Sequence, residues 1–126
     1  MKLTNPHHIA LICSDYRKTK AFYVDKLGFS VELEEWREPQ QDYLRMLRKG
    51  DTVLELFIRP DAPARVNNPE ALGLRHLAFH VEDIEPAVAW LNSMGIVTEP
   101  IREDQVNGGR FTFFKDPDGL PLELHE

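Results

Sequence analysis

The sequence predicts an α+β protein made of two copies of one module, each containing a strand, a helix and three further strands. Three observations lead to this fold class. The first is an internal repeat that spans most of the chain. The second is a series of short apolar runs with the period-two alternation that is typical of strands. The third is a matched pair of helix signals, an aspartate before each expected helix and a glycine after it.

The repeat is clearest at the two ends of each copy. His8-Ile9-Ala10-Leu11 aligns with His76-Leu77-Ala78-Phe79, an offset of 76 − 8 = 68 residues. The same offset aligns Glu55-Leu56 with Glu123-Leu124, so each His is followed by a Glu 47 residues later (55 − 8 and 123 − 76). We therefore interpret residues 1–126 as a single domain of two modules, at about residues 5–60 and 74–126.

The elements of the first copy follow in order. Its first strand is the apolar run that contains His8. Asp15 is the expected N-cap of a helix that runs to about Leu27, where Gly28 supplies a left-handed stop. The turn Lys49-Gly50-Asp51 separates the last two of the remaining strands. These strands are expected at Ser30–Trp36, Tyr43–Arg48 and Thr52–Ile58.

The second copy repeats this order. Asp83 is the expected N-cap of a helix to about Met94, and Gly95 follows it. The turn Asp116-Pro117-Asp118-Gly119 precedes the last strand. Strands are expected at Val97–Ile101, Arg110–Lys115 and Pro121–His125. Between the copies, Arg59–Gly73 contains three prolines and is predicted to be a linker.

Charge and hydropathy exclude several classes of protein. The net charge of −6 argues against a general nucleic-acid binder, which would carry a basic surplus. No apolar stretch approaches the roughly 20 residues that span a bilayer, so no membrane partner is expected. The single cysteine, Cys13, cannot form an internal disulfide. We expect a cytoplasmic protein.

The repeated His and Glu residues predict a metal site. His8 and His76 each lie in a first strand, and Glu55 and Glu123 each interrupt an apolar last strand. A single strand His is more often a core or edge residue, and a single strand Glu more often lies on a solvated face. A matched set is different, because a carboxylate is costly to bury unless it is paired or bound to a metal. Two imidazoles and two carboxylates near a two-fold axis suit nickel, zinc, cobalt, iron or manganese.

These motifs resemble the vicinal oxygen chelate superfamily, which includes glyoxalase I, methylmalonyl-CoA epimerase, fosfomycin-resistance thiol transferases and extradiol dioxygenases. The chain is most similar to small bacterial glyoxalase-like proteins of the YaeR type. The resemblance implies paired βαβββ modules, the glyoxalase/bleomycin resistance/dioxygenase fold, with curved mixed sheets around a metal, and a homodimer. It is carried by His8–Leu11, Phe22-Tyr23, Leu27–Phe29, Val53–Leu56, Gly73–Phe79, Asp116–Gly119 and Leu122–Leu124.

Within the superfamily, the His, Glu, His, Glu order matches the glyoxalase I pattern of metal ligands. The resemblance implies a lyase or isomerase that abstracts a proton next to a metal-chelated carbonyl of a small substrate. Glu123 would be the base and Glu55 its partner, with nickel or zinc as the metal. Ile12 stands where glutathione-using glyoxalases have an Arg, and the Asn expected after the second ligand is missing, which leaves glutathione in doubt.

Three alternatives stay open beside this function. They are another metalloenzyme of the superfamily, either an epimerase or a dioxygenase, a resistance-type protein that binds a small molecule, and a structural or regulatory protein. Metal content separates the first two, because binding members have usually lost ligands.

The arginines near the expected site suggest an anionic substrate. Arg59 lies four residues past Glu55, and Arg45 and Arg110 lie on the neighbouring strand of each copy. A guanidinium matches carboxylate and phosphate groups. His80, two residues beyond His76, is a further candidate contact. The alternative reading is that these arginines are strand-edge residues paired with the abundant Asp and Glu.

Overall fold

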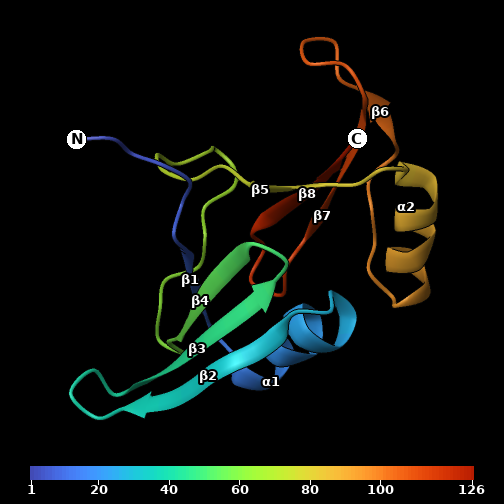
Figure 1. The fold of residues 1–126 in the computed structure, drawn as a ribbon. Helices are drawn as coiled ribbons and strands as arrows, with labels where there is room; N and C mark the ends of the chain where they lie inside the picture. Colours follow the sequence, from blue (N-terminus) through green and yellow to red (C-terminus); the bar gives the residue numbers. More distant parts are fainter. The chain divides into compact units, whose positions relative to one another are not determined.

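The computed structural model describes residues 1–126 and divides them into two compact units, Met1–Pro63 and Ala64–Glu126. Each unit contains one four-stranded mixed sheet and helical structure that packs against it (Figure 1). In each unit the chain order is strand, helix, then three strands. The α+β fold class predicted from the sequence is therefore confirmed.

The sheet of the first unit has the strand order β1-β4-β3-β2. The two strands that carry the repeat motifs, β1 and β4, pair in parallel, and the other neighbours pair antiparallel. A register shift in β2 lies between Val31 and Leu33. The bounds are β1 Ile9–Cys13, β2 Ser30–Arg37, β3 Asp42–Lys49 and β4 Thr52–Ile58.

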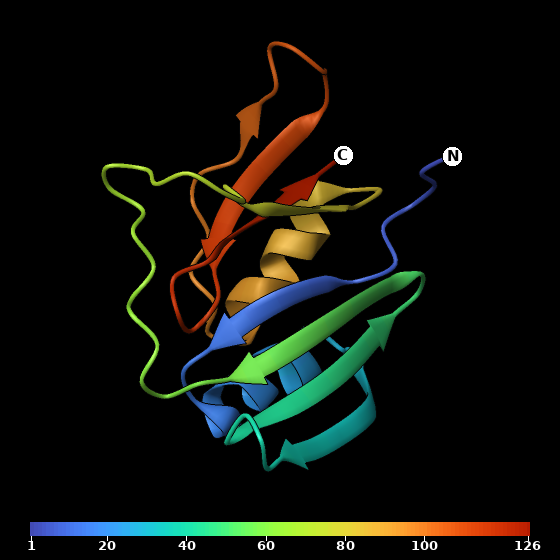
Figure 2. The same cartoon turned by 90° about the vertical axis from the view of Figure 1, so that its left-hand side faces the viewer.

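The helix of the first unit begins where the sequence predicts. The Asp15 side chain accepts a hydrogen bond of 2.9 Å from the backbone N–H of Lys18, which caps α1 (Tyr16–Lys20). The helix continues as the π-helix η1 (Ala21–Lys26), and Gly28 then adopts the positive φ of +79° that ends it. Figure 2 shows α1 and η1 covering one face of the sheet.

The core of the first unit lies between this helix and the sheet. Alternate residues of β4, Leu54 and Leu56, are completely buried, as is Tyr23 of η1. Glu55, which lies between them, and Phe57, which follows Leu56, therefore point from the opposite face of the sheet. The two faces have separate roles, one for packing and one for the candidate site.

The second unit repeats this arrangement with the strand order β5-β8-β7-β6 (Figure 2). Strands β5 and β8 pair in parallel, as β1 and β4 do. The Asp83 side chain caps α2 by accepting from the N–H of Glu85 at 3.2 Å. Leu91 of α2 and Leu122 of β8 are completely buried. The bounds are β5 Leu77–His80, α2 Ile84–Ser93, β6 Arg102–Glu103, β7 Arg110–Lys115 and β8 Pro121–His125.

One predicted strand is wrong. Residues 97–101 form no strand, and the pairing with β7 is confined to Arg102–Glu103. Glu99 still donates its N–H to Phe113 O at 2.9 Å, but Pro100 has no N–H and cannot extend a ladder. The edge strand is therefore displaced toward the β6–β7 turn and shortened.

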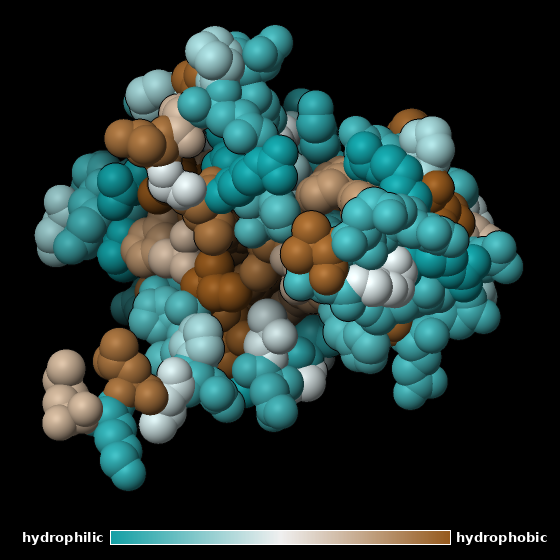
Figure 3. All heavy atoms as spheres, turned by 90° about the horizontal axis from the view of Figure 1, so that it is seen from above, coloured by the Kyte–Doolittle hydropathy of each residue, from teal (hydrophilic) through white to brown (hydrophobic).

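Exposed apolar side chains remain on the first unit. Ile12 and Leu33 lie on the face of the sheet that carries Glu55, and they are 52% and 40% exposed. Hydrophilic residues cover most of the surface seen in Figure 3, with hydrophobic ones gathered in patches between them. None of the helices has the length and apolar character required to cross a membrane.

Candidate metal centre

The first unit brings His8 and Glu55 together across two parallel strands. In the register of β1 with β4, Ala10 lies opposite Glu55, and His8 precedes Ala10 by two residues, so all three share one face. His8 Nε2 lies 3.4 Å from Glu55 Oε2. The Glu55 side chain is 18% exposed and the His8 ring 39%. An imidazole nitrogen and a carboxylate oxygen thus converge at the entry to β1.

The second unit contains the same pair in the same register. Ala78 of β5 lies opposite Glu123 of β8, and His76 precedes Ala78 by two residues. His76 Nε2 lies 2.8 Å from Glu123 Oε2. Glu123 is buried, and it points from the face of β8 opposite to the one on which its neighbours Leu122 and Leu124 pack. The duplication therefore conserves a geometry as well as a spacing of residues within the chain.

Two side chains that touch the histidines were missed by the sequence analysis. His7 Nδ1 lies 2.9 Å from His8 Nδ1, so one of these nitrogens donates a proton to the other. When His8 is the donor, its Nε2 carries the lone pair that faces Glu55, which is the tautomer a metal ligand needs. In the second unit, Phe113 packs edge-on against the His76 ring at 5.1 Å.

Both contacts could have been inferred from the sequence. The alternation of β7 places Phe113 on the face of Glu123, its partner in the register. His7 directly precedes His8 in the sequence. Their rings are in contact because the chain bends at His7, before β1 begins at Ile9, so the two neighbouring side chains need not point to opposite faces.

The donor chemistry of the two pairs fits a divalent transition ion. Neutral imidazole and carboxylate are the ligands that zinc, nickel, cobalt, manganese and iron accept. Each pair supplies two donors, and the structure shows no cluster of three or more His, Cys, Asp or Glu side chains placed to hold an ion. A pair alone provides half of the usual four ligands.

Arg45 is not placed to contact a substrate beside Glu55. In the register of β3 with β4, Arg45 lies opposite Leu56, on the face that packs against the helix. Its side chain is completely buried, its guanidinium stacks on the Tyr16 ring at 3.4 Å, and its Nη2 donates to Glu34 Oε1 at 3.0 Å. Arg45 therefore belongs to the helix–sheet packing.

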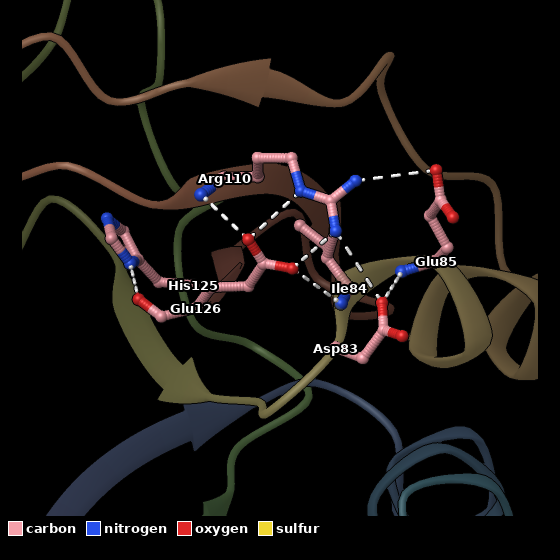
Figure 4. A network of polar contacts seen from close by, with 6 residues as sticks. All are labelled: Asp83, Ile84, Glu85, Arg110, His125 and Glu126. Atoms are coloured by element: carbon pink, nitrogen blue, oxygen red, sulfur yellow. Dashed lines mark hydrogen bonds and ion pairs between the residues drawn. The ribbon is translucent and has the colours of Figure 1, made fainter.

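Arg110 is held by carboxylates within its own unit (Figure 4). Its Nε and Nη2 donate to Glu126 at 3.0 and 2.7 Å, and its other contacts are Glu85 at 3.4 Å and Asp83 at 3.6 Å. The Arg110 guanidinium lowers the pKa of the Glu126 carboxyl to about 2. Because three carboxylates neutralise its guanidinium, Arg110 attracts a further anion only weakly.

The other two predicted contacts are exposed. His80 lies at the end of β5 opposite His125, on the face of Glu123. Arg59 directly follows β4, and its side chain, half exposed, donates through Nε to Asp42 Oδ2 at 3.0 Å. Of the predicted substrate contacts, Arg59 alone combines exposure with a side chain that a neighbour already orients.

His125 borders the second pair and is itself held by an acid. Its Nε2 lies 2.9 Å from Asp104 Oδ2, and its ring stacks on Phe111. The hydrogen bond to Asp104 raises the pKa of His125 above its ordinary value. The pKa of Asp104 is lowered, first by the backbone N–H of Asn107 and then by His125.

Comparison with known proteins shows close relatives of the whole chain. Residues 5–124 match the family described as the Glyoxalase/Bleomycin resistance protein/Dioxygenase superfamily. The chain is 58% identical to YwkD of Bacillus subtilis (strain 168), with 100% of this chain and 99% of YwkD covered. It is 52% identical to YaeR of Escherichia coli (strain K12), with 98% and 97% covered.

The crystal structure of a glyoxalase family protein from Enterococcus faecalis is also similar. It has a TM-score of 0.96 and 54% identity, and the match covers 100% of both chains. The fold described above and the resemblance to YaeR-type proteins therefore agree with the comparisons.

More distant relatives carry names that describe a function. The chain is 30% identical to the glutathione transferase FosA of Serratia marcescens, with 98% of this chain and 81% of FosA covered. It is 28% identical to a 2-epi-5-epi-valiolone epimerase of Actinomyces sp., with 94% and 76% covered. TnmS3, an antibiotic binding protein from Streptomyces sp. CB03234, has a TM-score of 0.75 and 26% identity, with 99% and 97% covered.

Proposed function

Because the chain belongs to the Glyoxalase/Bleomycin resistance protein/Dioxygenase superfamily, we propose that it is a divalent-metal-dependent enzyme of the glyoxalase I type. It would move a proton next to a carbonyl group of a small substrate. The observation that carries this proposal is the pair of matched His–Glu contacts, 3.4 Å in one unit and 2.8 Å in the other.

His8, Glu55, His76 and Glu123 are the proposed ligands of one ion, with nickel or zinc as the first candidates. Each His–Glu pair contributes one imidazole nitrogen and one carboxylate oxygen. Isolated ion pairs that merely stabilise strands need not recur at matched positions, whereas two halves of one ligand set must. The same strand register in both units, with Ala10 and Ala78 opposite the two glutamates, supports the proposal that these four residues bind a metal.

The ion, when bound, supplies Lewis-acid polarisation of a substrate oxygen. The protein supplies the base. Glu123 is the proposed base because its carboxylate is buried and is held against His76, where it can take a proton from one carbon and return it to the neighbouring carbon. No atom is gained or lost in such an isomerisation. Glu55, whose side chain is more exposed, is its proposed partner.

The second candidate function is the binding of a small molecule without turnover. It is favoured by the similarity to the antibiotic binding protein TnmS3. The retention of both His–Glu pairs favours the enzyme, as does the similarity to a named epimerase and a named transferase. Metal content separates the two functions.

We also propose a homodimer. Two-fold dimers are the commonest closed assemblies, and exposed Ile12 and Leu33 offer apolar surface on the Glu55 face. Light scattering at micromolar concentration should give twice the mass of the chain. A monomer mass at that concentration would contradict the proposal.

The test of the enzymatic proposal is proton exchange. Metal-loaded protein is incubated in D2O with a panel of hemithioacetals and acyl-CoA esters, and incorporation of deuterium next to the carbonyl is followed by NMR. The wild-type protein should catalyse exchange on at least one compound, and Glu123→Gln should slow it by about 10²–10⁴-fold. Glu103→Gln, at an exposed edge, is the control and should match the wild type. Undiminished exchange in Glu123→Gln would refute the assignment of the base.

A further inference from the structure

Three charged side chains meet at one end of the first unit's sheet, away from the His–Glu pair. They are Arg37 at the end of β2, Asp42 at the start of β3, and Arg59 just after β4. Asp42 is 3% exposed, and both of its oxygens are engaged. Arg37 donates to it through Nε at 2.8 Å and Nη2 at 2.7 Å, and Arg59 through Nε at 3.0 Å.

The cluster carries an excess positive charge. The bidentate contact from Arg37 already satisfies Asp42, so Arg59 is a second cation on a single carboxylate. Hydrogen bonds from Arg37, and then from Arg59, lower the pKa of Asp42, which keeps the carboxylate ionised. Two guanidinium groups against one carboxylate leave a net charge of about +1. The carboxylates of Glu35 and Glu55 also act on Arg37 from a greater distance, but Asp42 alone accepts hydrogen bonds from both arginines.

The arginines are held in position and still have donors to offer. The Arg37 guanidinium lies over the Phe57 ring at 4.7 Å as well as against Asp42. The Arg59 side chain uses only its Nε, so the N–H groups of its two terminal nitrogens can reach a ligand. Its side chain is 50% exposed. A rigid cation beside an accessible one is a suitable arrangement for an oxyanion.

The cluster shares a face of the sheet with Glu55. Register places Met46 opposite Glu55 and Leu44 opposite Phe57, so Asp42, two residues further along β3, lies on the same face. The backbone N–H of Arg59 donates to Cys13 O at 2.7 Å, which continues the strand pairing one residue beyond β4. Four residues of strand separate Glu55 from Arg59, or about 13 Å at roughly 3.3 Å per residue.

We propose that Arg37 and Arg59, braced by Asp42, bind the carboxylate or phosphoryl group of the substrate. The substrate class is then an elongated anionic carbonyl compound, whose anionic end lies on the order of 10 Å from the oxygens that react near Glu55. The identity of the occupant as a substrate rests on the proposed function. Phe57, between the two ends, offers an apolar surface for the connecting chain.

The experiment is an NMR titration of the full chain that follows the side-chain Nε–H signals of Arg37 and Arg59. The probes are inorganic phosphate and acetate, at constant ionic strength. Both the protein as purified and chelator-treated protein are titrated, because phosphate could also bind a metal. We expect saturable shifts of both signals in both samples, and Arg59→Gln should weaken binding at least tenfold. Phosphate binding tighter than acetate would identify a phosphoryl group, and comparable binding a carboxylate.

Arg48→Gln is the matched control. Arg48 lies on the same face of β3 at the other end of the sheet, its side chain is 46% exposed, and Glu32 neutralises it at 2.5 Å. It should bind the probes within twofold of the wild type. Arg59→Lys, which keeps the charge without the planar fork, should bind more weakly than the wild type and more tightly than Arg59→Gln.

Non-saturating shifts, or equal losses in Arg59→Gln and Arg48→Gln, would overturn the anion site. This outcome is independent of the metal proposal. If the protein binds phosphate here but no metal, the proposed function is refuted and the anion site stands. If it binds metal but no anion, the anion site is refuted and the proposed function stands.

Discussion

His76 Nε2 and Glu123 Oε2 lie 2.8 Å apart across the parallel pair β5–β8. The corresponding atoms of His8 and Glu55 lie 3.4 Å apart across β1–β4. In both units the histidine stands just before the first strand and the glutamate at the middle of the last one. The recurrence of this contact in both units is the observation on which the proposed ligand set, and with it the proposed function, rests.

Acid should weaken the fold through Glu126. Its pKa is lowered from 4.5 to about 2 by Arg110, so ionised Glu126 favours the folded state. This contribution is complete above the unfolded pKa of about 4.5 and is lost as the pH falls toward 2. Urea unfolding of Glu126→Gln should show lower stability than the wild type at pH 6, and the difference should shrink as the pH approaches 2. A difference that is constant over this range would contradict the assignment.

The Asp15 cap should stabilise the first helix. Its side chain accepts from the N–H of Lys18, which no residue of the helix can otherwise satisfy. Asp15→Ala should lower the free energy of unfolding by about 1 kcal/mol, measured by urea denaturation. Asp25→Ala, at an exposed position of η1, should change it by less than about 0.5 kcal/mol. Equal effects of the two substitutions would argue against capping.

Arg45 should be replaceable by methionine. Its Nε and Nη1 are buried without a hydrogen-bond partner, and each such group opposes folding by about 1–3 kcal/mol. Arg45→Met removes them and keeps the packing volume beside Tyr16, so it should be at least as stable as the wild type. Glu34, about one-third exposed, keeps the Tyr16 hydroxyl as a hydrogen-bond donor and is otherwise solvated. A loss of more than about 2 kcal/mol on thermal or urea unfolding would show that the ion pair and the ring stacking outweigh the burial of the charge.

Much of the fold could be predicted from the periodicity of apolar residues and from the turn residues that bound each apolar run. Thr52–Ile58, Arg110–Lys115 and Pro121–His125 were predicted with their observed bounds, because turns with glycine delimit the apolar runs. The edge strand at Arg102–Glu103 was not, since residues 97–101 look like a strand and Pro100 decides where pairing can occur. Local pattern predicts an element, but the partner strand determines how far it extends.

The side of the sheet on which Arg45 lies could not be read from its own strand. Alternation separates Arg45 from Leu44 and Met46, but only the register with β4 shows which group faces Glu55. The Arg37–Asp42 contact was missed for a different reason. Both residues were expected to lie just outside their strands, whereas β2 ends at Arg37 and β3 begins at Asp42. The His–Glu pairs were accessible to sequence reasoning because duplication supplied a second copy of the same register.

The central claim is tested most directly by the metal content of histidine variants. Protein is loaded with nickel or zinc, dialysed, and analysed by inductively coupled plasma mass spectrometry. The wild type should retain about one ion per set of four ligands, and His8→Ala and His76→Ala should each retain less than about a tenth of that. His80→Ala, exposed on the Glu123 face, should load like the wild type. Equal loading of all four proteins would contradict the account.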